Sequence, residues 1–222
     1  MKKLELPNVT LIALTNKDFE GHKKAIDKSC EGIEFGAVKL IWDEKITSID
    51  EWNRKIVFEL HNYVDTSHAL LIHGDGYVIN PHIWEQKYTG ELQAFLKGYY
   101  PDKFPNSYRL GELWMNYDYV GAPWPLPKDD YSYRTPEGEI IRVGNSVSLR
   151  SKKLMQIPST HNLEWKEYYG NTNEDGYLCV HQRKWLEMQG CKFAPLEVAI
   201  HFSKEHEIPE NVGLSTFAFH SL

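Results

Sequence analysis

Short apolar runs alternate with amphipathic stretches in the first third of the chain. Residues 9–14, 35–42 and 69–72 are rich in apolar and β-branched side chains, as are strands buried on both faces of a parallel sheet. Residues 18–30 and the stretch from Trp52 to Tyr63 have apolar positions near helical spacing. This order predicts an α/β fold, with a Rossmann-type, mostly parallel sheet flanked by helices, in a single domain.

The second helix and the rest of the chain carry further local signals. Ser48 and Glu51 have the Ser-x-x-Glu spacing of a capping box, which predicts a helix start there. Beyond residue 110 the pattern predicts strands at 117–122, 143–149 and 196–202, and helices at 150–157 and 174–189.

Composition limits the classes of function. The net charge of −6 argues against a protein that binds nucleic acid through a basic surface. No apolar run reaches the roughly 20 residues of a membrane span. The three cysteines are odd in number and form no CxxC pair, which predicts a protein of the reducing cytoplasm. The 7 Trp and 13 Tyr suit either a packed core or a cleft that stacks sugar or base rings.

In open parallel sheets, ligands bind beyond the carboxyl ends of the strands. Thr15 and Asn16 follow the first predicted strand, where a base and ribose would be contacted. Asp75 follows the third, between two glycines that allow close approach of the backbone. A carboxylate there can hold a divalent cation whose coordination shell is completed by diphosphate oxygens. An ordinary Gly-Asp-Gly turn is the alternative.

Three later segments could also contribute. Gly144 and Asn145 form a corner that suits a pocket floor, or an ordinary β-turn and edge strand. Glu174 and Asp175 form an acidic pair at a predicted helix start, where they serve as a solvated cap or as a general base with an orienting partner. The aromatic residues before His220 predict a packed tail that brings this histidine to a defined place, as a structural residue or as a ligand. Residues 204–209 read as a solvated face.

Together these segments resemble a bacterial family of glycosyltransferases. The resemblance covers roughly residues 66–220. It rests on the Gly-Asp-Gly turn, on Tyr-Asp-Tyr-Val-Gly-Ala-Pro-Trp at 117–124 and on Val-Gly-Asn with Ser-Leu-Arg-Ser at 143–151. The acidic pair at 174–175, Glu-Val-Ala with Phe-Ser-x-Glu at 197–205, and the aromatic–His tail complete it. Two departures stand out: His73 precedes the turn where the family has the first Asp of Asp-x-Asp, and Ser146-Val147 replaces a Gly-Gly pair.

The resemblance implies a GT-A-like fold with two halves. Residues of about 1–80 would bind a nucleotide-sugar, a UDP-sugar by preference, and residues of about 81–222 would bind a glycan acceptor. It implies an inverting, metal-assisted transfer in bacterial surface polysaccharide synthesis, with Asp175 as base and Glu174 beside it. Asp75 and His220 would hold Mn²⁺ or Mg²⁺. Trp124 and Tyr119 would stack on sugar. The nucleotide side would include Thr15, Asn16, His73, Asp75, Gly144 and Asn145.

Two other functions remain open. A non-catalytic carbohydrate- or nucleotide-binding module on the same fold would bind sugar without turnover and without metal dependence. A glycoside hydrolase is disfavoured, because adjacent carboxylates cannot readily span the roughly 5 to 10 Å that flank a glycosidic bond. For the transferase we expect a location in the cytoplasm, at the inner face of the membrane if the acceptor is membrane-bound, with no nucleic-acid partner.

Overall fold

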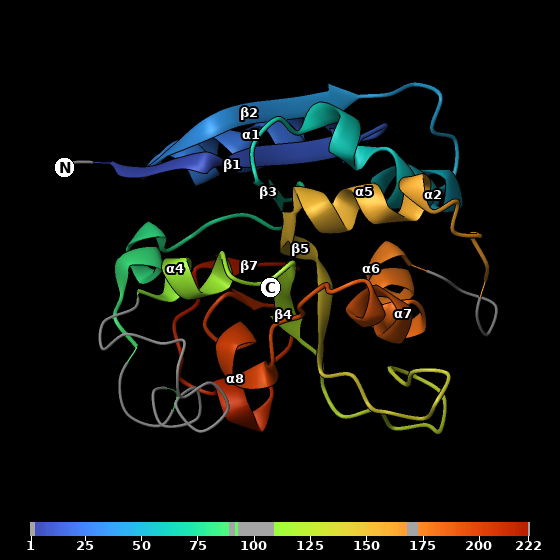
Figure 1. Cartoon of the computed structure of the whole chain (residues 1–222). Helices are drawn as coiled ribbons and strands as arrows, with labels where there is room; N and C mark the ends of the chain where they lie inside the picture. The colour runs from blue at the N-terminus through green and yellow to red at the C-terminus, as the bar shows by residue number, and fades with distance from the viewer. Residues whose placement is uncertain (1–2, 89–91, 93–108, 168–172, 222) are drawn as a thin grey trace.

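A computed structural model describes residues 3–88, 92, 109–167 and 173–221. Its centre is a five-stranded sheet in the order β2-β1-β3-β5-β4 (Figure 1). β1 pairs in parallel with β2 and β3, β5 is antiparallel to β3, and β4 is antiparallel to β5. Four of the five strands therefore run in one direction and only β5 is reversed. The strands are β1 (Leu4–Thr15), β2 (Ile33–Trp42), β3 (His68–Leu71), β4 (Tyr119–Pro123) and β5 (Val143–Ser151).

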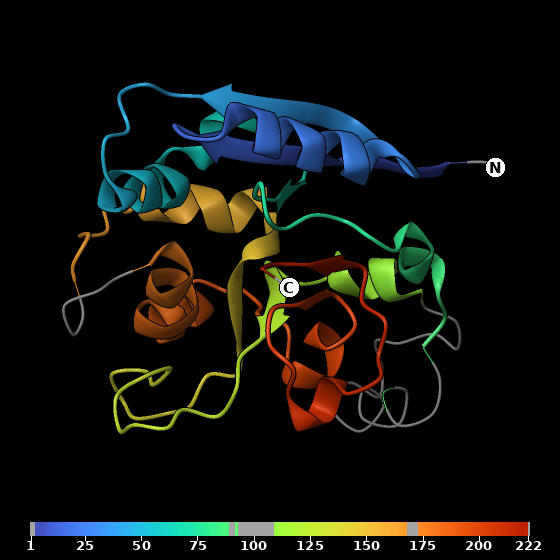
Figure 2. The same ribbon diagram turned by 180° about the vertical axis from the view of Figure 1, so that it is seen from behind.

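Helices cover both faces of the sheet. α1 (Phe19–Cys30) lies on one face of β1 and β2, and α2 (Ile49–Phe58) and α5 (Lys152–Thr160) lie on the other (Figures 1 and 2). Side-chain alternation along β1 produces this layering: Leu11 packs in the core cluster of α1, whereas Ile12 packs in that of α2 and α5. The fold is therefore mixed α/β, and the early strand and helix predictions are confirmed.

The capping box predicted at the start of α2 is present. The Ser48 hydroxyl accepts from the Glu51 amide at 3.1 Å, and the Glu51 carboxylate accepts from the Ser48 amide at 3.2 Å. This local pairing holds the start of α2 next to the carboxyl end of β1, where the Trp52 indole also donates to the Leu14 carbonyl at 2.7 Å.

The second half adds short elements around β4 and β5. Trp114, Phe202 and Phe217 belong to the same core cluster as Leu11 and Leu70, so the two halves of the chain share one core. The elements are α4 (Leu110–Trp114), α6 (Glu174–Gly176), the π-helical turn η3 (Tyr177–His181), α7 (Arg183–Met188), α8 (Leu196–Ala199), β6 (Ser203–Lys204) and β7 (Ala218–Phe219), with 3₁₀ turns η2 (Pro81–Glu85) and η4 (Pro209–Asn211). A further 3₁₀ turn in the first half, η1 (Leu60–Tyr63), follows α2.

Two sequence interpretations are corrected. The strand expected at 196–202 is instead the short helix α8 followed by a turn at 200–202, and the helix begins directly after Pro195, a residue whose fixed φ is compatible with a helix start. β5 is an internal strand rather than an edge strand, because it pairs with both β3 and β4. Within the described part of the chain, every helix is too short or too polar to cross a membrane.

Candidate functional site

A cavity of about 360 Å³ opens at the carboxyl ends of β1 and β3. This is the edge at which open α/β sheets bind ligands, and the size is typical of a small-molecule site. Segments distant in sequence surround it: the turn after β1, the start of α2, the end of β3, β5, the acidic turn and the tail. The lining residues are Leu14, Thr15, Asn16, Lys17, His22, Ser48, Ile49, Trp52, Asn53, His73, Asn145, Ser146, Asn173, Asp175, Glu205 and His220.

The turn after β1 forms one wall. Thr15 is 4% exposed, and its hydroxyl accepts from the Lys17 amide at 3.0 Å. The Asn16 side-chain amide donates to the Ile46 carbonyl at 2.7 Å, so this side chain is held in place while its oxygen remains available to a ligand. Both residues therefore lie in the predicted region, at the carboxyl end of β1.

The turn after β3 positions His73 and Asp75 differently. His73 lines the cavity with its ring 5.3 Å from that of Trp52 and 5.1 Å from that of His220. Burial, helped by the neighbouring His220, lowers the pKa of His73 to about 3, so its imidazole is neutral at physiological pH. Asp75 does not line the cavity: 66% of its side chain is exposed beside His220, and its carboxylate accepts from the Ser221 hydroxyl at 2.8 Å.

The C-terminal tail brings His220 to Asp75. A Cβ at Gly76 would come within 2.9 Å of the His220 ring, so glycine is needed for this close approach. His220 Nδ1 lies 3.0 Å from the Asn145 amide nitrogen and 3.5 Å from a Glu205 oxygen. Burial lowers the pKa of His220, but the Glu205 hydrogen bond and the Asp75 charge outweigh it and raise the pKa overall. The prediction of a packed tail is confirmed.

Asp75 and His220 fit a cation that is only partly held by protein. Asp75 Oδ1 and His220 Nε2 lie 3.6 Å apart, and Glu205 on Nδ1 is placed to orient the imidazole. No cluster of three metal-binding side chains occurs among the residues that the structure describes. The Asp75 carboxylate suits Mg²⁺ or Mn²⁺, which commonly keep water and substrate phosphate as their other ligands, whereas an imidazole ligand from His220 suits Mn²⁺ better than Mg²⁺, because Mg²⁺ prefers oxygen ligands.

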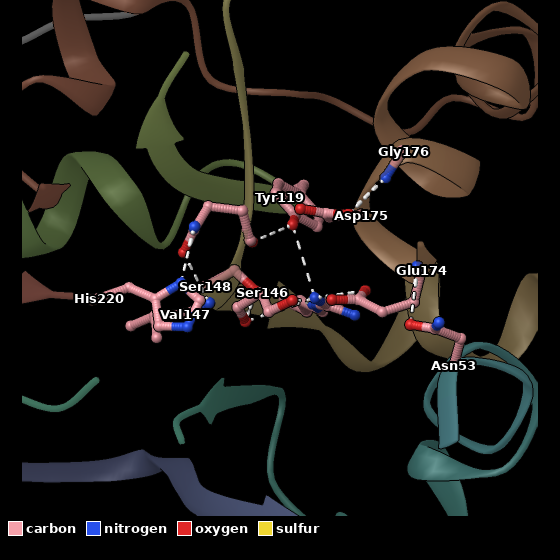
Figure 3. A network of polar contacts seen from close by, with 11 residues as sticks. Asn53, Tyr119, Ser146, Val147, Ser148, Glu174, Asp175, Gly176 and His220 are labelled. Atoms are coloured by element: carbon pink, nitrogen blue, oxygen red, sulfur yellow. Dashed lines mark hydrogen bonds and ion pairs between the residues drawn. The ribbon is translucent and has the colours of Figure 1, made fainter. Parts of the chain in front are cut away.

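The two acidic residues of α6 face different surroundings (Figure 3). Asp175 lines the cavity. Burial, reinforced by the Glu174 charge, raises the pKa of Asp175 to about 7. Glu174 is fully buried and forms an ion pair with Arg150 at 2.7 Å. The predicted pair is therefore divided: Asp175 is available to a ligand, and Glu174 is not.

The predicted sugar-stacking residues belong to the core. Tyr119 is 0% exposed, and its hydroxyl donates to the Asn145 carbonyl at 2.5 Å. Trp124 is 5% exposed and stacks on Tyr133 with ring centroids 4.8 Å apart. Gly144 does not line the cavity; it gives room to Trp124, because a Cβ there would lie 1.9 Å from that ring. This corrects the interpretation of Tyr119 and Trp124, whose ring faces are already covered by protein.

Several lining residues lay outside the sequence prediction. Asn53 and Trp52 come from the buried face of α2, where an amphipathic pattern is typical of core packing alone. Glu205 was expected on a solvated face, yet its side chain is only 20% exposed and contacts His220. The signal that could have identified it is the Phe-Ser-x-Glu spacing, which places a carboxylate two residues after a buried serine in β6.

Asn145 links several of these features. It is buried with φ of +78°, a left-handed conformation that asparagine tolerates better than most residues. Its side-chain oxygen accepts from the Val147 amide at 2.9 Å, which fixes the amide orientation and directs the nitrogen at His220. The cavity thus brings together Asp175, a carboxylate with a pKa near neutrality, and His220, which also contacts the exposed Asp75 outside the lining.

Comparisons with known proteins locate the chain in a family. No curated protein matches it. A family model described as protein of unknown function (DUF5672) matches residues 103–220, just over half of the chain. The matched region contains β4, β5, the acidic turn and the tail, and therefore Asn145, Asp175, Glu205 and His220. The chain belongs to this DUF5672 family.

Proposed function

We propose that this protein is a glycosyltransferase with a GT-A-like fold, which moves a sugar from a nucleotide-sugar to a hydroxyl of a glycan acceptor with inversion. The observation that carries the proposal is that Asp175 and His220 line one cavity at the carboxyl ends of the parallel strands, with Asp75 outside the lining but 3.6 Å from His220. Asp175 supplies a base, and the Asp75–His220 pair a site for a diphosphate-bound cation.

The chemistry assigns each group one task. The acceptor hydroxyl loses its proton to Asp175 as its oxygen forms a bond to the anomeric carbon. The bond from that carbon to the diphosphate oxygen breaks, and the nucleoside diphosphate leaves with the electron pair. A base with a pKa near 7 is half ionised at neutral pH and still basic enough to accept a proton.

Asp75 and His220 would hold the cation, and a bound cation would neutralise charge on the departing diphosphate. Thr15 and Asn16 stand where ribose and base would be contacted. The neutral His73 between Trp52 and His220 offers a hydrogen bond without adding charge. The turn after β1 and the start of α2 therefore form the nucleotide side of the proposed site.

The biological setting rests on the sequence resemblance. It favours a UDP-sugar as donor, a membrane-bound glycan as acceptor and a role in bacterial surface polysaccharide synthesis at the inner face of the membrane. The cavity supports a small-molecule donor, since its 360 Å³ is lined by polar groups from eight separate segments.

A thermal-shift screen tests the proposal. We expect nucleoside diphosphates and nucleotide-sugars to raise the melting temperature with Mn²⁺ present, and to do so much less with a chelator. Nucleosides without phosphate serve as the ligand control. Turnover is then followed as release of nucleoside diphosphate with the best donor and a panel of glycans. Absence of a metal-dependent shift for every nucleotide would contradict the proposal, and binding without turnover would favour the non-catalytic module.

A further inference from the structure

Arg150 is a buried cation directly behind the acidic turn. It projects from β5 with 0% exposure, and it lies between Glu174 and Tyr119. Its Nε donates to the Ser148 hydroxyl at 2.8 Å, its Nη2 lies 2.7 Å from the Glu174 carboxylate, and its guanidinium carbon is 5.1 Å from the Tyr119 ring centroid. A buried charge of this kind is costly unless it is paired, so this pairing needs an explanation.

The partner of Arg150 immediately precedes Asp175. Glu174 is held from two sides, because its amide donates to the Asn53 side chain at 3.1 Å while its carboxylate meets Arg150 (Figure 3). These contacts anchor the first residue of α6 between α2 and β5. Asp175 is the next residue and turns into the cavity, with its own carboxylate accepting from the Gly176 amide at 2.7 Å.

The same network extends to the histidine side of the cavity. The Tyr119 hydroxyl, 3.5 Å from Arg150 Nη2, donates to the Asn145 carbonyl, and the Asn145 amide reaches His220. A chain of polar contacts therefore runs from Glu174 through the Arg150 guanidinium to His220. Such a position is suited to holding a reactive carboxylate in place.

We propose that Arg150 is a positioning residue, whose buried ion pair with Glu174 fixes the turn that carries Asp175 and balances the charge beside it. The inference rests on the proposed function in treating Asp175 as the base. Other groups also act on Asp175 from the neighbouring elements: Glu205 after β6, His220 in the tail, Tyr119 on β4, Tyr133 in the following loop and Cys179 in η3.

Two single variants and one double variant of the Arg150–Glu174 pair separate an effect of charge from an effect of packing. The two single variants should shift the titration of Asp175 in opposite directions. Glu174→Gln removes a negative charge and leaves Arg150 uncompensated, so Asp175 should lose its proton at lower pH. Arg150→Met removes the positive charge that favours the ionised form, so Asp175 should keep its proton to higher pH. Each shift should be roughly one to two pH units, the size expected for unit charges several ångströms apart at an effective dielectric constant of about 20. In the double variant both charges are gone, so Asp175 should titrate at nearly the same pH as in the unmodified protein.

The titration is read directly by NMR on the full chain labelled with ¹³C-carboxyl aspartate and glutamate. Asp175→Asn assigns the signal. Glu187→Gln is the matched control, because Glu187 also pairs with an arginine, Arg183 at 2.6 Å, but lies outside the cavity. Melting temperatures are recorded in parallel. If one single variant does not fold, the other single variant and the double variant decide.

Opposite shifts in the two single variants, with none in Glu187→Gln, support the inference. Shifts in the same direction, or no shift in any folded variant, overturn it and leave a packing role for Arg150. The titration involves no sugar transfer, so its failure is separate from failure of the transferase proposal. Once turnover is measured, the double variant should also lower kcat at least about tenfold with little change in KM; an unchanged kcat would overturn the positioning role.

Discussion

At the scale of single residues, adjacent side chains of the same chemical type have different surroundings. Glu174 and Asp175 differ by one methylene and one position, yet one is neutralised by Arg150 inside the core and the other meets the cavity. Burial beside a second carboxylate raises the pKa of Asp175 to about 7. The environment therefore decides which of the two can exchange a proton with a ligand.

Asp175→Asn should lower the transfer rate by roughly 10²–10⁴, the usual contribution of general base catalysis. Donor affinity should change little, because the lost group acts on the acceptor hydroxyl. In the unmodified protein the kcat of the proposed transfer should rise as pH increases through about 7 and then level, since only the ionised carboxylate accepts a proton.

Steady-state kinetics from pH 5 to 9 measure both effects. Asp130→Asn is the matched control, because Asp130 is exposed and does not line the cavity. A near-full rate in Asp175→Asn, or retained anomeric configuration in the product, would reject Asp175 as the base.

Asp75→Asn should weaken metal-dependent nucleotide binding at least about tenfold, or about 1.4 kcal/mol. The side chain is 66% exposed, so loss of its carboxylate should not disturb the core. Calorimetric titration with Mn²⁺ and a nucleoside diphosphate measures the effect, and Asp27→Asn on the exposed surface of α1 is the control. Equal affinity in Asp75→Asn would remove Asp75 from the metal site.

At the scale of elements, the short strand pair β6–β7 delivers two site residues together. Ser203 and Lys204 pair with Ala218 and Phe219, so that Glu205 and His220 follow directly from paired positions. The buried Phe217 anchors this pair in the core. Packing of Phe217 in the core therefore positions the tail, and the register of the β6–β7 pair positions His220 next to Glu205.

Deletion of residues 220–222 should abolish transfer while lowering the melting temperature only slightly, because Phe217 and the β6–β7 pairing remain. The deletion also removes the Ser221 hydrogen bonds to the Asp75 carbonyl at 3.0 Å and carboxylate at 2.8 Å. Removal of residue 222 alone is the control. Full activity in the longer deletion would show that His220 has no part in the reaction.

At the scale of the whole molecule, the cavity joins the two halves of the chain. A ligand that binds only the folded form adds about 2.7 kcal/mol of stability at a hundred times its Kd. Hydrogen exchange should show whether that ligand contacts both halves. With bound nucleotide and Mn²⁺ we expect slower exchange at 15–17, 48–53, 145–146 and 220–221 together, and unchanged exchange in α7, which does not line the cavity. Protection confined to the first 80 residues would show that the tail stays apart from the nucleotide.

The early elements follow from sequence because their signals are local. The alternation along β1 and the Ser48–Glu51 cap each depend on residues within a few positions. The same rules place Thr15, Asn16 and His73 at the correct edge of the sheet. The strand expected at 196–202 shows the limit of such signals, since a short apolar run fits a buried helix equally well.

The hydrophobic pattern determined the α/β class and the edge of the sheet that carries the cavity, and the family resemblance placed Asp175 and His220 at that site. Only the tertiary structure decided that Tyr119 and Trp124 are core residues. It also decided that Glu174 forms an ion pair with Arg150 and that Glu205 contacts His220. The physical reason is that burial and ion pairing depend on contacts between positions far apart in the sequence. For example, the Glu174 amide donates a hydrogen bond to the Asn53 side chain, 121 residues away. A carboxylate becomes a base or a structural ion according to those contacts, which no local pattern contains.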